Sequence, residues 1–199
     1  MKRDLWPNRP EGKGGRIFIM DIRIIEFISE NMQSPLLDQI MPAISRLGNG
    51  GLIWLAVAAL LMTRRKHRTA GLMVICAVAL GAVLGEVILK NIFQRARPFV
   101  DAPHFELLIE RPLTRYSFPS GHATSSFAAA GTVLRTVDSA LIKGPVLLLA
   151  CAVAFSRVYL LVHYPSDILG GIVLGLLSAY VVYRLFSRGR NTAGSQTPE

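Results

Sequence analysis

The stretch GPVLLLACAVAFSRVYLLVHYPSD (residues 144–167) decides the fold, because a long apolar run in it ends in three ionisable residues. Its first half has no polar face, which a helix of a soluble protein needs. Runs near 20 residues match the thickness of a bilayer. Comparable apolar runs cover 51–62, 70–89, 145–163 and 168–183. A further segment, 121–137, is rich in small and hydroxyl residues and suits a helix buried among other helices.

These runs predict an all-α fold, a polytopic membrane helical bundle, rather than a soluble bundle with an unusually apolar core. We expect one transmembrane domain over residues 20–187. The polar, Gly- and Pro-rich residues 1–19 predict a disordered N-terminal extension, and 188–199 a disordered C-terminal tail.

Residues 20–46 are amphipathic and are interrupted by Pro35 and Pro42. The pattern predicts two short helices at the membrane surface, or a partial insertion. The segment LGNGG (47–51) predicts a turn or a break at a helix start.

The formal net charge of +9 is explained by topology rather than by nucleic acid. Basic residues collect at the ends of apolar runs, as in cytoplasmic loops under the positive-inside rule, and no aromatic residues interleave them as in RNA-binding proteins. The basic positions are Arg64, Arg65, Lys66, Arg68, Arg135, Lys143, Arg184, Arg188 and Arg190. The predicted partners are therefore membrane lipids, and nothing in the sequence indicates an oligomeric state.

A cytoplasmic position for Arg64–Arg68 fixes the direction of every span. The chain then has five transmembrane helices, with 20–46 at the outer surface or forming a sixth. It is predicted to be a multi-pass protein of the cell membrane. The ionisable residues of the spans all fall at the outer membrane face, and such residues usually mark a functional site.

The first polar cluster is Lys90 and Arg97, which lie seven residues apart and share one side of a helix if that helix continues. The alternative is that both side chains simply reach the lipid head groups. Glu86, one turn before Lys90, is expected to pair with it.

The second cluster is in FPSGHATSS (118–126), where Ser120 and Gly121 stand at a predicted helix start. Free backbone N–H groups there can bind an anion, and Gly121 lets an anion approach closely. Plain capping by Ser120 is the alternative. Capping does not explain His122, for which a buried neutral histidine is the simplest interpretation.

The third cluster holds Arg157, His163 and Asp167. A carboxylate bound to one imidazole nitrogen leaves the other nitrogen free to attack or to accept a proton. The alternative is a structural pair at the start of the helix that begins at Pro165.

Together the clusters describe a phosphate clamp with two histidines, one suited to nucleophilic attack and one to acid catalysis. No Cys cluster or carboxylate pair suits a metal, so we expect neither metal nor cofactor. Cys76 and Cys151 lie in apolar runs and are expected to act as small hydrophobic residues without a disulfide.

Three motifs carry a resemblance to a known family: KNIFQRARP (90–98), PSGH (119–122) and SRVYLLVHYPSD (156–167). They match K-x6-RP, PSGH and SR-x5-H-x3-D, and the chain resembles the type 2 phosphatidic acid phosphatase superfamily. The resemblance implies that Lys90, Arg97 and Arg157 bind phosphate, with Ser120 and the Gly121 backbone adding hydrogen bonds. It further implies roles for three side chains: nucleophile for His163, orienting carboxylate for Asp167 and leaving-group acid for His122.

The spans and the resemblance together predict a lipid phosphatase that works through a phosphohistidine. Undecaprenyl pyrophosphate, phosphatidylglycerophosphate and phosphatidic acid are substrates in bacterial relatives. A lipid phosphotransferase would use the same residues, and a non-enzymatic lipid-phosphate binder or transporter is a third possibility. A haloperoxidase is a distant fourth, since those relatives are soluble.

Overall fold

The computed structural model describes residues 13–101, 107–112 and 114–194, and the described residues are almost entirely helical. Short 3-10 turns at Asn49–Gly51 and Arg65–His67 join helices, and Val83–Leu89 is a π-helical segment between α4 and α5. The α-helices are α1 (Lys13–Asn31), α2 (Pro35–Leu47), α3 (Leu52–Thr63), α4 (Arg68–Ala82), α5 (Lys90–Phe93), α6 (Pro98–Asp101), α7 (Gly121–Thr136), α8 (Ala140–Tyr159) and α9 (Pro165–Gly194).

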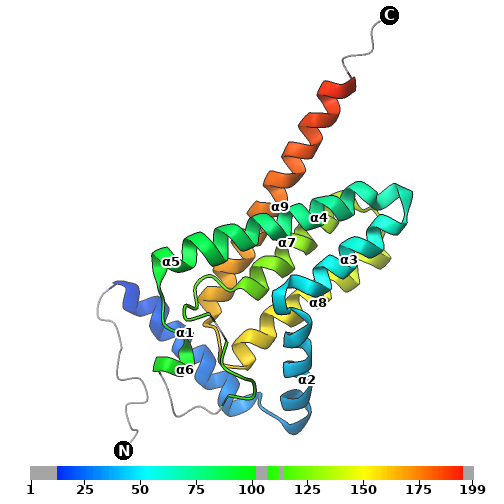
Figure 1. Cartoon of the computed structure of the whole chain (residues 1–199). Coiled ribbons are helices and arrows are strands. Elements are labelled where there is room, and N and C mark those ends of the chain that lie inside the picture. The colour runs from blue at the N-terminus through cyan, green and yellow to red at the C-terminus, as the bar shows by residue number, and fades with distance from the viewer. Residues whose placement is uncertain (1–12, 102–106, 113, 195–199) are drawn as a thin grey trace, which may run out of the picture.

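Helix α7 is the centre of the bundle and packs against α4, α8 and α9 (Figure 1). Its small residues, among them Ala128, Ala129 and Ala130, are fully buried. This confirms the prediction that 121–137 is buried among other helices. Small side chains allow the neighbouring helices to come close on every side.

Two glycines bring α9 into contact with the backbone of α7. A methyl group on Gly171 would lie 2.7 Å from the carbonyl oxygen of Ser120, and one on Gly175 would overlap the carbonyl oxygen of Thr124. The GIVLG pattern therefore serves close helix packing, which fixes the start of α7 against the start of α9.

The amphipathic segment forms two helices, as predicted, with Ser34 capping α2 and Pro35 at its first turn. Pro42 lies inside α2 rather than breaking it, contrary to our expectation. The break comes instead at Gly50 and Gly51, whose positive φ angles of 59° and 71° turn the chain into α3.

Three helical segments are long and apolar enough to cross a membrane: Arg65–Asp101, Ala140–Tyr159 and Pro165–Arg188. The pair Pro35–Leu47 and Asn49–Thr63, bent by 47°, would add a fourth if it is one broken span. The chain is therefore a multi-pass helical protein. Helices α3 and α7 are shorter than a bilayer requires, so the predicted total of five or six spans stays a prediction.

Helical structure extends further toward both ends of the chain than the sequence predicted. Helix α1 begins at Lys13, within the segment predicted to be disordered, and α9 continues to Gly194. Residues 1–12 and 195–199 lie outside the described residues.

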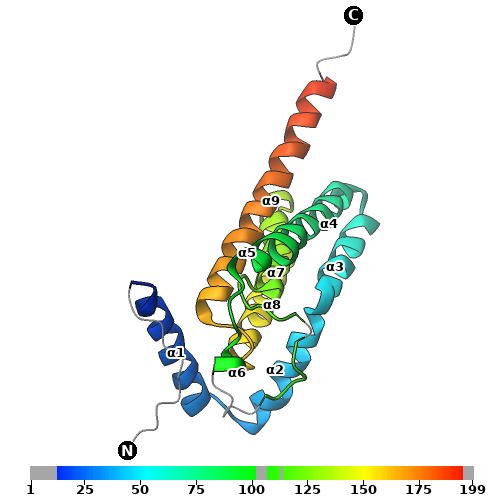
Figure 2. The same ribbon diagram turned by 60° about the vertical axis from the view of Figure 1, so that its left-hand side comes forward.

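The predicted polar clusters gather at one end of the bundle. Figures 1 and 2 show α1, α2, α6 and the turn between α8 and α9 at this end. The basic turn between α3 and α4 and the C-terminal part of α9 lie at the other end.

Replacing Gly175 with alanine is expected to destabilise the protein, because the new methyl group would overlap the α7 backbone. Overpacking of this kind costs about 1–3 kcal/mol, which corresponds to roughly 2–4 °C in melting temperature for each kcal/mol. Thermal unfolding in detergent measures the change.

Gly144→Ala is the matched control, since nothing lies within 4 Å of its added methyl group. It should leave the melting temperature unchanged or slightly raised. Equal melting temperatures for the two variants would contradict the packing described for α7 and α9.

Candidate active site

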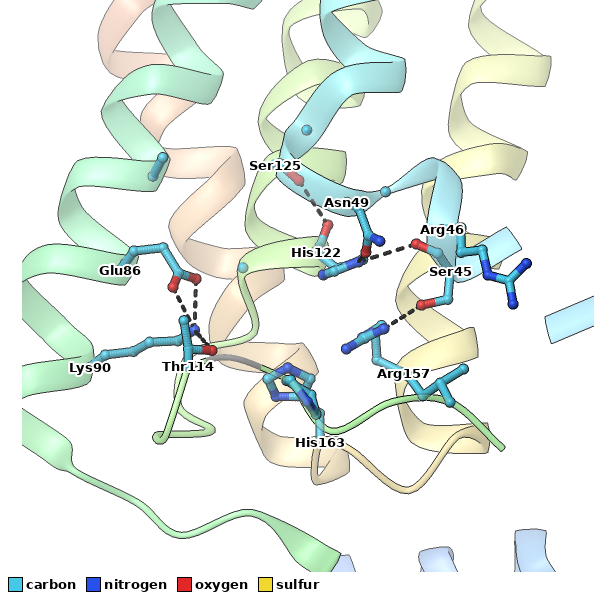
Figure 3. Close-up of a pocket in the computed structure, with 18 of the residues that line it drawn as sticks. Ser45, Arg46, Asn49, Glu86, Lys90, Thr114, His122, Ser125, Arg157 and His163 are labelled. Carbon is cyan, nitrogen blue, oxygen red and sulfur yellow. Dashed lines mark hydrogen bonds and ion pairs between the residues drawn. The ribbon is translucent and has the colours of Figure 1, made fainter. Parts of the chain in front are cut away.

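A cavity of about 900 Å³ lies at the polar end of the bundle, a volume typical of small-molecule sites. Figure 3 shows side chains from several helices turned toward this space. Six of the eight predicted site residues line it: Lys90, Arg97, Gly121, His122, Arg157 and His163. Ser120 and Asp167 are buried just behind it.

Lys90 and Arg97 reach the cavity by a different route from the one predicted. Helix α5 ends at Phe93, and Gln94 takes a left-handed conformation with φ 46°. Arg97 therefore points inward from a loop rather than from the helix face that carries Lys90. The π-helical segment before Lys90 is a feature often found at functional sites.

Lys90 is paired, as expected, with Glu86. Its Nζ donates to both carboxylate oxygens of Glu86 at 2.7 Å and lies 3.3 Å from Thr114 Oγ1. The same carboxylate lies against Gly121, where a methyl group would overlap it. The absence of a side chain at Gly121 thus lets the Glu86 carboxylate approach the start of α7, and the predicted contact of Gly121 with a phosphate stays a prediction.

Arg97 is buried and held in one orientation by neutral acceptors. Its Nε donates to the carbonyl of Thr114 at 2.9 Å, and Nη1 donates to the carbonyl of Val162 at 2.8 Å. Nη2 donates to Thr114 Oγ1 at 2.7 Å. Nη1 also lies 3.2 Å from Nε2 of His163.

Arg157 has more unused hydrogen-bonding capacity. Its Nη1 donates to the hydroxyl of Ser45, and its buried Nε has no partner in the described part of the chain. No carboxylate of the described residues lies within ion-pair distance of Arg97 or Arg157. Two buried cations without counterions are costly, and an anionic ligand would remove that cost.

Ser120 caps α7, and its Oγ accepts from the backbone N–H of Ala123 at 3.5 Å. It is fully buried, and its own N–H donates to the carbonyl of Asp167 at 3.1 Å. Its observed contacts are those of the capping alternative, and they join the starts of α7 and α9.

The hydrogen bonds of His122 define its tautomer. Nε2 lies 3.2 Å from the carbonyl oxygen of Ser45 and 3.1 Å from Oδ1 of Asn49. A carbonyl oxygen only accepts, so Nε2 carries a proton. His122 therefore presents an N–H at the cavity, which an acid catalyst requires.

His163 has the opposite arrangement at the cavity. Arg97 can only donate, so Nε2 of His163 accepts and carries a lone pair. The proton is then on Nδ1, which lies 3.5 Å from Oδ2 of Asp167. This distance exceeds a normal hydrogen bond, and the buried Nδ1 has no hydrogen-bond partner among the described residues. The tautomer is the one that a nucleophilic Nε2 needs.

The surroundings of His163 also keep it neutral. Burial lowers the pKa of its imidazole well below the usual value, and the positive charges of Arg97, Arg157 and Lys90 lower that pKa further. The backbone of Ser117 acts weakly in the other direction. A neutral imidazole retains the lone pair that attack requires.

Asp167 and His163 lie across a turn, as predicted. Helix α8 ends at Tyr159, Leu161 takes a positive φ of 58°, and Pro165 begins α9. Asp167 Oδ2 accepts from the backbone N–H of Tyr164 at 2.9 Å, so the carboxylate also stabilises the start of α9. The catalytic and the structural interpretations of this carboxylate are therefore compatible.

Arg95 and Asp21 were missed by the sequence reasoning. Arg95 Nη1 donates to Oδ1 of Asp167 at 2.7 Å, and Nη2 donates to Oδ2 of Asp21 at 2.7 Å. Arg95 could have been suspected, because it interrupts an apolar context beside Arg97. Asp21 carries no such signal, since acidic residues are common in an amphipathic helix.

Comparison with known proteins identifies the family of this chain. The model of the PAP2 superfamily matches residues 70–190. The undecaprenyl-diphosphatase of Sulfolobus acidocaldarius is 32% identical over 170 residues, covering 85% of this chain and 80% of that protein.

Two solved structures have similar folds. The crystal structure of Aquifex aeolicus LpxE superposes with a TM-score of 0.72 and 27% identity, covering 83% of this chain and 95% of that one. The PAP2 type phosphatidylglycerolphosphate phosphatase of Bacillus subtilis has a TM-score of 0.69 and 25% identity, covering 87% of both chains. The family match, the shared fold and the site together establish that this chain belongs to the PAP2 superfamily and is a membrane phosphatase.

Proposed function

We propose that the protein is an integral membrane lipid phosphatase that hydrolyses a phosphate or pyrophosphate monoester through a phosphohistidine, without a metal. One observation carries this proposal. Arg97 and Arg157 are buried at a cavity with no carboxylate partner among the described residues, and the unprotonated Nε2 of His163 lies beside Arg97. This arrangement suits a bound phosphate and a nucleophile directed at its phosphorus.

The reaction assigns one task to each group. Nε2 of His163 attacks phosphorus while Lys90, Arg97 and Arg157 stabilise the negative charge of the transition state. The Ser120 hydroxyl and the backbone N–H of Gly121 are proposed to donate hydrogen bonds to the phosphate. With the anionic phosphate bound, His122 is protonated on both ring nitrogens. The bond to the leaving oxygen breaks, the Nε2 proton of His122 passes to that oxygen, and His122 becomes a neutral imidazole.

The second half of the reaction regenerates the enzyme. His122, now lacking its Nε2 proton, takes a proton from water, and the resulting hydroxide attacks the phosphohistidine. Phosphate leaves, His163 regains the lone pair on its Nε2, and His122 is again protonated on both ring nitrogens. Asp167 stabilises the positive charge that His163 carries during each transfer.

A lipid substrate is supported by the setting of the cavity. It lies at the end of helices that can cross a membrane, and the relatives are named as phosphatases of undecaprenyl diphosphate and phosphatidylglycerolphosphate. We infer a substrate of this class, such as undecaprenyl pyrophosphate, phosphatidylglycerophosphate or phosphatidic acid.

An extracytoplasmic site is supported by the distribution of charge along the bundle. The basic turn between α3 and α4 lies at the end opposite the cavity (Figure 1). Basic turns favour the cytoplasm, so the cavity would open at the outer face.

The two alternatives differ from this proposal at defined steps. A phosphotransferase would pass the phosphoryl group of His163 to an acceptor lipid instead of water. A binder or transporter would need the cations but not the nucleophile. No observation in the described structure favours either one.

Replacing His163 with alanine is expected to reduce phosphate release about 10⁴-fold or more, because the nucleophile is lost. Phosphate release from undecaprenyl pyrophosphate or phosphatidylglycerophosphate in detergent measures the effect, with and without an acceptor lipid. His67→Ala is the control, since His67 lies in the basic turn between α3 and α4. Substantial turnover by folded His163→Ala would eliminate the phosphohistidine route.

Chelation of metal should leave the reaction intact, because the cations of the site are side chains. Among the described residues, no three His, Cys, Asp or Glu side chains come together as metal ligands. We expect full activity in EDTA and inhibition by vanadate, a phosphate mimic. Loss of activity in EDTA that is restored by Mg²⁺ would contradict the proposal.

The imidazole of His163 is expected to remain neutral well below the usual pKa of about 6.5, since burial and three cations oppose its protonation. Replacing Arg157 with glutamine removes one of those charges and should raise the pKa of His163. Titration of the ¹⁵N-labelled side chain by NMR reports both values. A pKa of His163 that falls or does not change in Arg157→Gln would be inconsistent with the described electrostatics.

A further inference from the structure

We propose that Asp21 and Arg95 are positioning residues of the active site and make the N-terminal helix α1 part of the catalytic apparatus. This inference rests on the proposed function, because it takes His163 as the nucleophile. Asp21 lies outside residues 70–190, which the family model matches. The role proposed for Asp21 therefore rests on its contacts with the start of α9 and not on the family match.

The first step is the arrangement of Arg95. Its guanidinium bridges two carboxylates, donating from Nη1 to Asp167 and from Nη2 to Asp21, both at 2.7 Å. Its central carbon also lies 4.1 Å from the centre of the Tyr164 ring. A planar guanidinium fixed by two carboxylates and a ring has one available orientation, which in turn fixes Oδ1 of Asp167.

The second step is the position of Asp21, which is only 3% exposed. Its Oδ1 accepts from the backbone N–H of Ser166 at 2.9 Å, and its Oδ2 accepts from the Ser166 hydroxyl at 2.5 Å. Ser166 is the second residue of α9. Asp21 of α1 therefore accepts a backbone hydrogen bond at the start of α9, as a capping residue would, and Asp167 lies in the same helical turn.

The third step concerns Asp167, whose two oxygens are held from opposite sides. Arg95 holds Oδ1, and the N–H of Tyr164 holds Oδ2. The distance from Oδ2 to His163 Nδ1 therefore depends on where Arg95 holds the carboxylate, and Arg95 is itself held by Asp21. A displacement of a fraction of an ångström decides whether Nδ1 donates to Oδ2 at normal length.

The fourth step is charge. Asp21, Arg95 and Asp167 form a row with a net charge of −1 beside an imidazole that becomes positive during phosphoryl transfer. Removing Asp21 brings this row to zero and should lower the pKa of His163. Removing Arg95 brings it to −2 and should raise that pKa. These changes follow from the charges alone, so the positioning role is shown only when they are accompanied by a fall in kcat with little change in KM.

Other titratable groups face the same imidazole and are unchanged in both variants. Arg97 and Lys90 come from the α5 region, His122 from α7 and Arg157 from α8. Two acids lie one contact further away: Glu86 is paired with Lys90, and Asp101 of α6 accepts from the Tyr164 hydroxyl.

Asp21→Asn tests the inference with little change of shape. We expect kcat to fall about tenfold, as for partners one step removed from a reacting group, with KM changed less than twofold. Asp38→Asn is the matched control. Asp38, on α2, accepts from the Tyr159 hydroxyl at 2.6 Å and so also joins an N-terminal helix to the bundle, but it is not part of the Asp167 network. Its kcat should equal that of the unchanged protein.

The decisive readout needs no turnover. NMR titration of ¹⁵N-labelled His163 should give a lower pKa in Asp21→Asn and a higher pKa in Arg95→Gln. If Asp21→Asn does not fold, Arg95→Lys replaces it: the charge remains, so kcat should fall while the pKa of His163 stays nearly constant.

The two proposals can fail separately. Unchanged kcat in Asp21→Asn, an equal loss in Asp38→Asn, or pKa changes of one sign in Asp21→Asn and Arg95→Gln would overturn the positioning role. Full activity of His163→Ala combined with opposite pKa changes would instead overturn the phosphohistidine function and leave the charge row intact.

Discussion

Two buried arginines that have no carboxylate partner in the described part of the chain are the constraint on which the rest of the site depends. Arg97 and Arg157 are each less than 5% exposed, and neutral oxygens of Thr114, Val162 and Ser45 hold them. Burying two charges of one sign costs free energy that no carboxylate among the described residues offsets. The close contact of α7 with α9 lies at the same end of the bundle.

The same cations also fix the chemistry of the histidines. Because Arg97 can only donate, it leaves a lone pair on Nε2 of His163, and the added positive charge keeps that imidazole neutral. His122 has the complementary state, since acceptors on α2 and the following turn require a proton on its Nε2. One fold thus holds two histidines with opposite tautomers at one cavity, which is the arrangement that the proposed nucleophile and acid require.

Much of the site was predictable, because the deciding residues are polar interruptions of apolar runs. The sequence places all eight predicted residues in three clusters, and the structure brings them to one end of the bundle. The route of the chain was not predictable: Gln94 ends the helix that was expected to carry both Lys90 and Arg97. Asp21 was missed for a related reason. Its proposed role depends on the contact between α1 and α9, and residues that meet only through such a contact show no pattern in the neighbouring sequence.

The most direct test of the central claim is to identify the atom that receives the phosphoryl group. Enzyme mixed with a lipid phosphate should be quenched within one turnover at alkaline pH and analysed by peptide mass spectrometry. The account predicts an acid-labile phosphoryl group on His163, absent from His163→Ala. A phosphoryl group on another residue, or hydrolysis in a single step without any phosphorylated enzyme, would contradict it.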